Sequence, residues 1–104
     1  MDFCLKFLPE ALKEWRDLDG SARSQFKKAL VKRLANPHVP GMRLHADLVG
    51  CYKIKLRTLG YRLVYQVHDD EMAVIVIAVD KRDRLAAYKA AVSRLSKQRM
   101  TKGS

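Results

Sequence analysis

Four basic residues have the type and spacing that phosphate chemistry requires: Lys53, Lys55, Arg62 and Arg82. Lysine and arginine bind phosphate groups and stabilise the negative charge that develops on them in a transition state. A lysine held among other cations also has a lowered pKa, which allows it to act as a general base near neutral pH. A single lysine on a strand is typical of a solvated face. We expect these four to gather with no interleaved acid, and this combination favours an anion-binding site.

Two functions fit such a basic face. The first is plain RNA binding, in which the cations neutralise phosphates and Tyr52, Tyr61 or Tyr65 stacks on bases. The second is metal-free RNA cleavage, in which the 2′-hydroxyl of the substrate attacks the adjacent phosphate to give a 2′,3′-cyclic phosphate and a free 5′-hydroxyl. Cleavage needs a base, cations around the phosphorane and a proton for the leaving oxygen. The residues alone do not choose between these functions.

The composition predicts one small domain, residues 1–104, with a polyanionic partner. The chain has 21 Lys and Arg against 11 Asp and Glu, a net charge of +10, and is 48% hydrophobic. The longest apolar run, 72–79, is far shorter than the roughly 20 residues that a membrane span needs, so we expect no membrane partner. Cys4 and Cys51 form no zinc motif, and the start of the chain does not resemble an export signal. We expect a cytoplasmic protein with reduced thiols, no metal and no cofactor.

The apolar periodicity predicts an α+β fold with the order β-α-α-β-β-β-α. We expect a strand at 2–8, then two helices between Pro9 and Asn36 that are separated at Asp19-Gly20, with Ser21 capping the second. A loop at 37–50 leads into three strands, near 51–57, 61–67 and 72–79. A last helix covers 85–95, and a flexible basic tail covers 96–104. The predicted architecture is an antiparallel sheet with the N-terminal helix hairpin on one face and a C-terminal helix.

Strand alternation predicts where the basic residues point. Side chains two residues apart share a face, so Lys53, Lys55 and Arg57 lie together while their neighbours Tyr52, Ile54 and Leu56 face the core. Arg62 joins them on the open face if the meander packs its apolar side inward. The cations of the second helix lie mostly outside its apolar stripe: Arg23, Lys27, Lys28, Lys32 and Arg33. We interpret them, like the basic tail, as ordinary surface charge that would help to dock the protein on its polyanionic partner.

Three segments resemble the RelE family of type II toxins: CYKIKLRTLGYRLVYQV at 51–67, VIVIAVDKRDRLAAY at 74–88, and ALKEWRDLD at 11–19. The resemblance extends from Phe3 to about Leu95 with the same element order. It implies a ribosome-dependent endoribonuclease that cuts mRNA in the ribosomal A site, by attack of the 2′-hydroxyl and without metal, and so stops translation.

The resemblance also implies roles for individual residues. The catalytic set of the family falls on Lys53, Lys55, Arg62, Arg82 and Tyr88. Lys53 and Lys55 are candidates for the base and for transition-state stabilisation, and which group takes the proton stays open. Arg62 would hold the scissile phosphate, Arg82 would stabilise charge or protonate the leaving oxygen, and Tyr88 would orient the nucleotide or assist the base.

Four further residues are candidates for RNA contacts. Arg57 and Arg84 lie next to the catalytic set in the sequence and are interpreted either as RNA-binding or as solvated. The chain departs from the family just before the meander, where a family arginine is replaced by His45 and one extra residue precedes Cys51. Arg43 is the residue that could take over that contact with substrate or ribosomal RNA.

The expected partners follow from the resemblance. They are a ribosome with mRNA in its A site and a RelB-like antitoxin, with operator DNA bound only through the antitoxin. The antitoxin is expected to wrap the toxin and disturb the C-terminal helix, 84–97. Two other functions stay open. One is a ParE-like toxin, which shares the fold but acts on DNA gyrase, and the other is a non-catalytic module that binds RNA or antitoxin.

Overall fold

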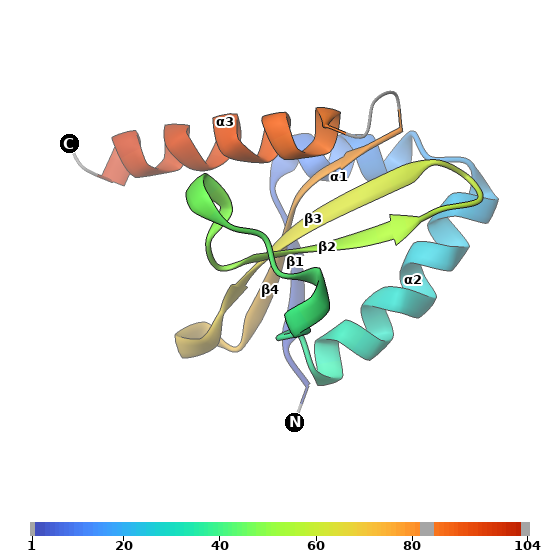
Figure 1. The fold of residues 1–104 in the computed structure, drawn as a ribbon, viewed down its shortest axis with the longest axis horizontal. Helices are drawn as coiled ribbons and strands as arrows, with labels where there is room; N and C mark the ends of the chain where they lie inside the picture. The colour runs from blue at the N-terminus through green and yellow to red at the C-terminus, as the bar shows by residue number, and fades with distance from the viewer. Residues whose placement is uncertain (1, 82–84, 103–104) are drawn as a thin grey trace.

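The computed structural model describes residues 2–81 and 85–102, and side chains up to Gln98 (Figure 1). The element order is the predicted one, and the α+β fold class is confirmed. The elements are β1 (Cys4–Phe7), α1 (Pro9–Arg16), α2 (Gly20–Ala35), β2 (Cys51–Leu56), β3 (Tyr61–His68), β4 (Ala73–Asp80) and α3 (Ala86–Lys102). Short 3₁₀ turns interrupt the loop before β2, at Pro40–Met42 and Ala46–Leu48.

The sheet has the strand order β1-β4-β3-β2. β2, β3 and β4 form the predicted antiparallel meander, but β1 pairs with β4 in parallel, so the prediction of a wholly antiparallel sheet is wrong. The reason is the helix hairpin, which carries the chain from β1 at one edge to β2 at the other. β4 therefore lies inside the sheet, as its continuous apolar run predicts.

The sheet separates two apolar clusters. Alternate residues of β3 divide between them, since Leu63 and Tyr65 face α1 and α2 while Val64 faces α3. Trp15 and Phe26 fill the first cluster from the helix hairpin. In Figure 1, α3 crosses the strands at the top of the view and α2 descends on the right, near β2. The helices thus cover both faces of the sheet.

Two of three predicted helix boundaries differ in the structure. The cap of α2 is Asp19 and not Ser21, because the Asp19 carboxylate accepts a hydrogen bond from the backbone N–H of Ala22 at 2.8 Å. Asn36 ends α2 as predicted. The predicted flexible tail is helical as far as Lys102, and this segment is rich in residues that favour helices. Within the described chain, no helix combines the length and the apolarity that crossing a bilayer requires.

A charged clamp joins α3 to α1 at an irregularity in β4. The pairing register of β3 and β4 shifts between Val64 and Tyr65, which leaves Ile77 opposite no residue of β3. Arg94 of α3 donates to the Ile77 carbonyl oxygen at 2.8 Å, and the carboxylate of Glu14 accepts the Val79 N–H at 3.1 Å. The two side chains also pair with each other through two contacts, at 2.8 and 2.9 Å. One ion pair therefore satisfies the bulged backbone and fixes α3.

Candidate active site

The β2–β3 hairpin brings three of the predicted catalytic residues onto one face. Lys53 and Lys55 lie two residues apart on β2, and Arg62 of β3 is the cross-strand partner of Lys55. Directly opposed side chains have Cβ atoms about 4.5–5.5 Å apart, and like charges at that separation destabilise a sheet. Gly60 makes the turn possible, because its φ of +77° lies in a region that other residues rarely adopt. The repulsion between these cations is the arrangement that binding an anion would relieve.

The neighbouring cations lower the pKa of Lys55 from its usual value of 10.5. The charge of Lys53 is the largest cause, followed by partial loss of hydration, a hydrogen bond with Lys53, and the charges of Arg62 and Arg57. A protonated Lys53 can donate to the neutral amine of Lys55 but not to its ammonium form, so this contact also favours the neutral state. Lys55 is exposed, which leaves its amine accessible to a substrate.

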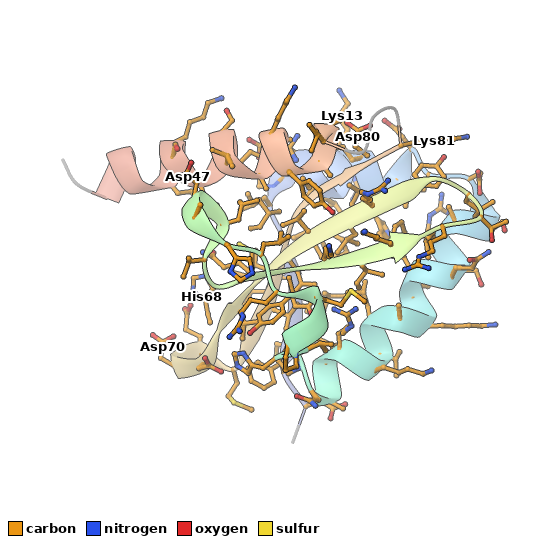
Figure 2. The ribbon with its side chains drawn as sticks, in the orientation of Figure 1. Lys13, Asp47, His68, Asp70, Asp80 and Lys81 are labelled. Atoms are coloured by element: carbon orange, nitrogen blue, oxygen red, sulfur yellow. The ribbon has the colours of Figure 1, made fainter. Side chains whose placement is uncertain are left out.

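An acid borders the three described cations of the predicted cluster but does not lie between them. Asp80, the last residue of β4, is the cross-strand partner of Arg62, so Lys55, Arg62 and Asp80 lie side by side across three strands. The three cations Lys53, Lys55 and Arg62 are called the basic row. The Asp80 carboxylate accepts the backbone N–H of Lys81 at 2.6 Å, and Figure 2 labels both residues at this end of the sheet. The carboxylate offsets positive charge at the Arg62 end of the row. Neither Lys53 nor Lys55 has an acidic cross-strand partner.

The remaining predicted catalytic residues follow β4. Arg82 and Arg84 lie outside the described residues. The segment that carries them begins beside the row, since the Lys81 ammonium lies 5.3 Å from the ring centre of Tyr61, which precedes Arg62. Tyr88 is partly buried on α3 against the second cluster, and with Leu85, Val92 and neighbouring residues it lines an open hollow of about 350 Å³. Among the described residues, no hydrogen bond or ring contact joins Tyr88 to Lys53, Lys55 or Arg62.

The predicted RNA-binding residues lie at two different places. Arg57 extends the basic row at the end of β2, where it shares a hollow of about 350 Å³ with Lys55 and Arg62. Arg43 and His45 are exposed in the loop before β2. The backbone of Arg43 pairs with that of Tyr52 in an isolated antiparallel β-bridge. At about 3.4 Å per residue, this position is closer to Lys53 than to Lys55. The loop therefore borders the opposite end of the basic face from Arg57.

Two of the three tyrosines proposed to stack on bases are not available for it. Tyr52 and Tyr65 are buried on the face covered by α2, where their rings stack at 5.6 Å. The Tyr65 hydroxyl donates to the Pro37 carbonyl at 2.8 Å and accepts from Arg33 at 2.8 Å. Burial raises the pKa of Tyr65, although the Arg33 contact opposes the shift. Only the partly exposed Tyr61 stays a candidate among the three.

One group of side chains could in principle hold a metal ion. The ligand atoms of His68, Asp70 and Glu71 lie within 4.8 Å of one another. Both His68 ring nitrogens already have partners, however: Glu71 at 3.2 Å and Gln66 at 2.7 Å. Figure 2 shows His68 and Asp70 at the far end of the sheet from Asp80 and Lys81. This group is therefore remote from the basic row and contributes nothing to it.

Comparison with known proteins identifies the family. Residues 5–86 match the model described as ParE toxin of type II toxin-antitoxin system, parDE. The mRNA interferase toxin RelE of Escherichia coli K12 is 48% identical over 95 residues, which cover 91% of this chain and 99% of that protein. The chain belongs to the RelE family of toxins. The match to the ParE model agrees with the expectation that ParE-like toxins share the fold.

Solved structures agree with this RelE-family assignment. A double arginine-to-alanine mutant of the E. coli toxin RelE in the free state superposes with a TM-score of 0.82 at 46% identity, covering 91% of this chain and 99% of that one. The toxin in the intact E. coli RelBE toxin-antitoxin complex gives a TM-score of 0.75 at 49% identity, covering 79% and 99%.

Proposed function

We propose that this protein is the toxin of a type II toxin–antitoxin pair and that it cuts mRNA on the ribosome. The single observation that carries the proposal is the pairing of Lys55 with Arg62 beside Lys53, in a chain 48% identical to an mRNA interferase. Repulsion among three adjacent cations destabilises the sheet unless a bound anion relieves it. The lowered pKa of Lys55 supports cleavage over binding alone, because a base is what cleavage requires and binding does not.

The proposed reaction uses Lys55 as the general base. Its neutral amine takes the proton of the 2′-hydroxyl, the 2′-oxygen forms a bond to phosphorus, and the bond from phosphorus to the 5′-oxygen breaks. Lys53 and Arg62 stabilise the extra negative charge on the phosphorane oxygens. Arg82 stabilises the negative charge on the leaving 5′-oxygen, which takes its proton from water because arginine keeps its own, and Tyr88 orients the nucleotide. The products are a 2′,3′-cyclic phosphate and a 5′-hydroxyl.

Mapping of mRNA ends after induced expression tests this proposal. Primer extension on translated messages should reveal new 5′ ends inside codons, and the upstream fragments should carry 2′,3′-cyclic phosphates. Intact messages in cells whose growth has stopped would contradict the proposal. A gyrase supercoiling assay on the same cultures separates the second candidate, a ParE-like gyrase inhibitor, which the description of the matching family model favours. A non-catalytic module would change neither readout.

The pH dependence of cleavage follows from the lowered pKa of Lys55. Because only the neutral amine is a base, the cleavage rate should rise about tenfold per pH unit and level off above that pKa. Lys53→Met removes the largest cause of the lowering, so the rising limb should move to higher pH. Lys6→Met, which removes an exposed lysine of β1, should leave the limb in place. Single-turnover rates on ribosome-bound mRNA between pH 6 and 9 would measure this. If the wild-type protein and Lys53→Met had the same rising limb, the result would contradict the assignment of Lys55 as the base.

Free RNA should be a poor substrate. Tyr52 and Tyr65, which could have stacked on bases, are buried, so the described part of the basic face offers cations but little to position a nucleotide. Positioning the attacking and leaving groups commonly contributes several orders of magnitude to a rate. We expect cleavage of a naked message to be at least about 100-fold slower than cleavage of the same message on ribosomes. Equal rates in the two assays, followed by gel electrophoresis of labelled RNA, would contradict this prediction.

The proposed partners are those of the related complex. The E. coli RelE toxin has been solved with its RelB antitoxin, and we infer a RelB-like antitoxin for this chain, with operator DNA bound through that antitoxin. Its expected docking site includes α3. A toxin that acts on translating ribosomes would work in the cytoplasm.

A further inference from the structure

A second basic site lies on the other face of the β2 edge. A groove of about 520 Å³ runs between α2 and β2, and five of the residues that line it are cations: Lys28, Lys32, Arg33, Lys55 and Arg57. None of the described residues that line the groove is acidic. The sequence alone predicts only that the outer-face charge of α2 helps to dock the protein. The packing of α2 against β2 turns three of these cations toward the strand and so gives the charge a location.

The positive charge on the α2 side of the groove destabilises the helix that carries it. Lys28 and Lys32 are exposed and four residues apart, a spacing at which like charges destabilise a helix. Over its 16 residues, α2 has no acidic side chain to compensate. Arg33 is held in place, because it donates to the Lys53 carbonyl at 3.1 Å and to the Tyr65 hydroxyl at 2.8 Å. On its α2 side the groove therefore combines one guanidinium held by hydrogen bonds with two exposed ammonium groups.

The groove is continuous with the candidate active site. Lys55 and Arg57 line both the groove and the hollow that contains Arg62. β2 is an edge strand, so no further strand separates the two sides. A polyanion bound at Arg62 could thus continue over the end of β2, or a second RNA segment could lie beside the first.

The lining of the groove indicates which polyanion it fits. Sites for single-stranded nucleic acid combine cations with aromatic platforms for the bases, and none of the lining residues is aromatic. Three lining residues are apolar, Ala29, Met42 and Ile54, but Ile54 is only 3% exposed, and the lining has no aromatic side chain of the kind that anchors a bound peptide. Five cations without aromatic or acidic neighbours in the lining suit the phosphate backbone of a duplex, which is recognised by shape and charge.

We propose that the α2–β2 groove binds the backbone of double-helical RNA, which in the ribosome is ribosomal RNA, and so docks the toxin while the adjacent basic row cuts the message. This inference rests on the proposed function for the identity of the RNA. It separates docking from cleavage: Lys28 and Lys32 contribute to affinity, whereas Lys53, Lys55 and Arg62 contribute to the reaction.

The salt dependence of RNA binding tests the groove directly. The variant Lys28→Gln/Lys32→Gln is compared with Lys13→Gln/Lys27→Gln, which removes the same charge from exposed positions of α1 and α2 outside the groove lining. The probe is a fluorescent RNA duplex of about 16 base pairs, titrated by anisotropy at several KCl concentrations. Each lost phosphate contact lowers the slope of log K against log salt by about one. For the groove variant this slope should fall by about two, and its affinity for the duplex should be more than tenfold weaker than that of the wild-type protein at about 0.1 M salt. The control variant should match the wild-type protein in both quantities.

Cleavage on ribosomes supplies the second readout. The groove variant should raise the KM for ribosome-bound mRNA severalfold and leave kcat unchanged, with a melting temperature equal to that of the control. Equal salt slopes in the two variants would overturn the proposal, and so would a groove variant that loses antitoxin binding but keeps RNA binding. If the wild-type protein cuts no message, the proposed function fails, while the duplex titration still decides whether the groove binds RNA.

Discussion

Lys55→Met should lower the rate of mRNA cleavage on ribosomes by about 10³-fold, within the 10²- to 10⁴-fold range typical of a general base. Methionine keeps much of the length of the side chain but cannot accept a proton. Lys55 is exposed, so the fold should persist. The measurement is the single-turnover cleavage rate at saturating ribosome concentration, and the melting temperature verifies folding.

Two further variants serve as controls for Lys55→Met. Lys6→Met removes a lysine of similar exposure from β1 and should cleave at the wild-type rate. Lys55→Arg keeps the positive charge but, because arginine does not lose its proton in this pH range, it should restore binding without restoring the rate. A variant with arginine that cleaves normally would show that Lys55 acts through its charge alone, and the base would then have to be sought elsewhere in the site.

The basic row could be predicted from the sequence only in part. Alternation along one strand is a local property, and it places Lys53 and Lys55 on the same face. The hairpin turn is short enough to place Arg62 opposite Lys55. The position of Asp80 depends on the register of β4 after the shift at Val64 and Tyr65, which side-chain packing decides. The sequence therefore indicates the cations but not the carboxylate that borders them.

The groove and the clamp escape sequence analysis for a related reason. The rotation of α2 about its axis decides whether Lys28 and Lys32 face solvent or β2, and the apolar stripe defines that rotation only broadly. Glu14 and Arg94 are 80 residues apart in the chain, so no local pattern connects them. The parallel pairing of β1 with β4 is likewise a consequence of the path of the chain through the helix hairpin.

The clamp between Glu14 and Arg94 should be a principal source of stability. Arg94→Ala is expected to lower the free energy of unfolding by about 2–4 kcal/mol, because it removes two charge-assisted hydrogen bonds to Glu14 and one donor to the bulged backbone. The Arg94 side chain is only 15% exposed, so water screens the pair weakly. Urea denaturation is the suitable measurement, since guanidinium would itself screen the charges. Lys13→Ala, next to Glu14 on the exposed side of α1, should change stability by less than about 0.5 kcal/mol.

Exchange of the two charges distinguishes this clamp from a simple ion pair. In Glu14→Arg/Arg94→Glu the charges attract as before, but the Val79 N–H then faces a donor and the Ile77 carbonyl faces an acceptor. If the backbone contacts matter as much as the pair, the exchange should not restore stability, and the double variant should stay at least about 2 kcal/mol below wild type. Hydrogen exchange should show faster opening of α3 in that variant. Full recovery would mean that the charges alone hold the helix. In that case the bulge in β4 would be satisfied without them, and the position of Tyr88 would depend on the apolar cluster beneath α3 rather than on the clamp.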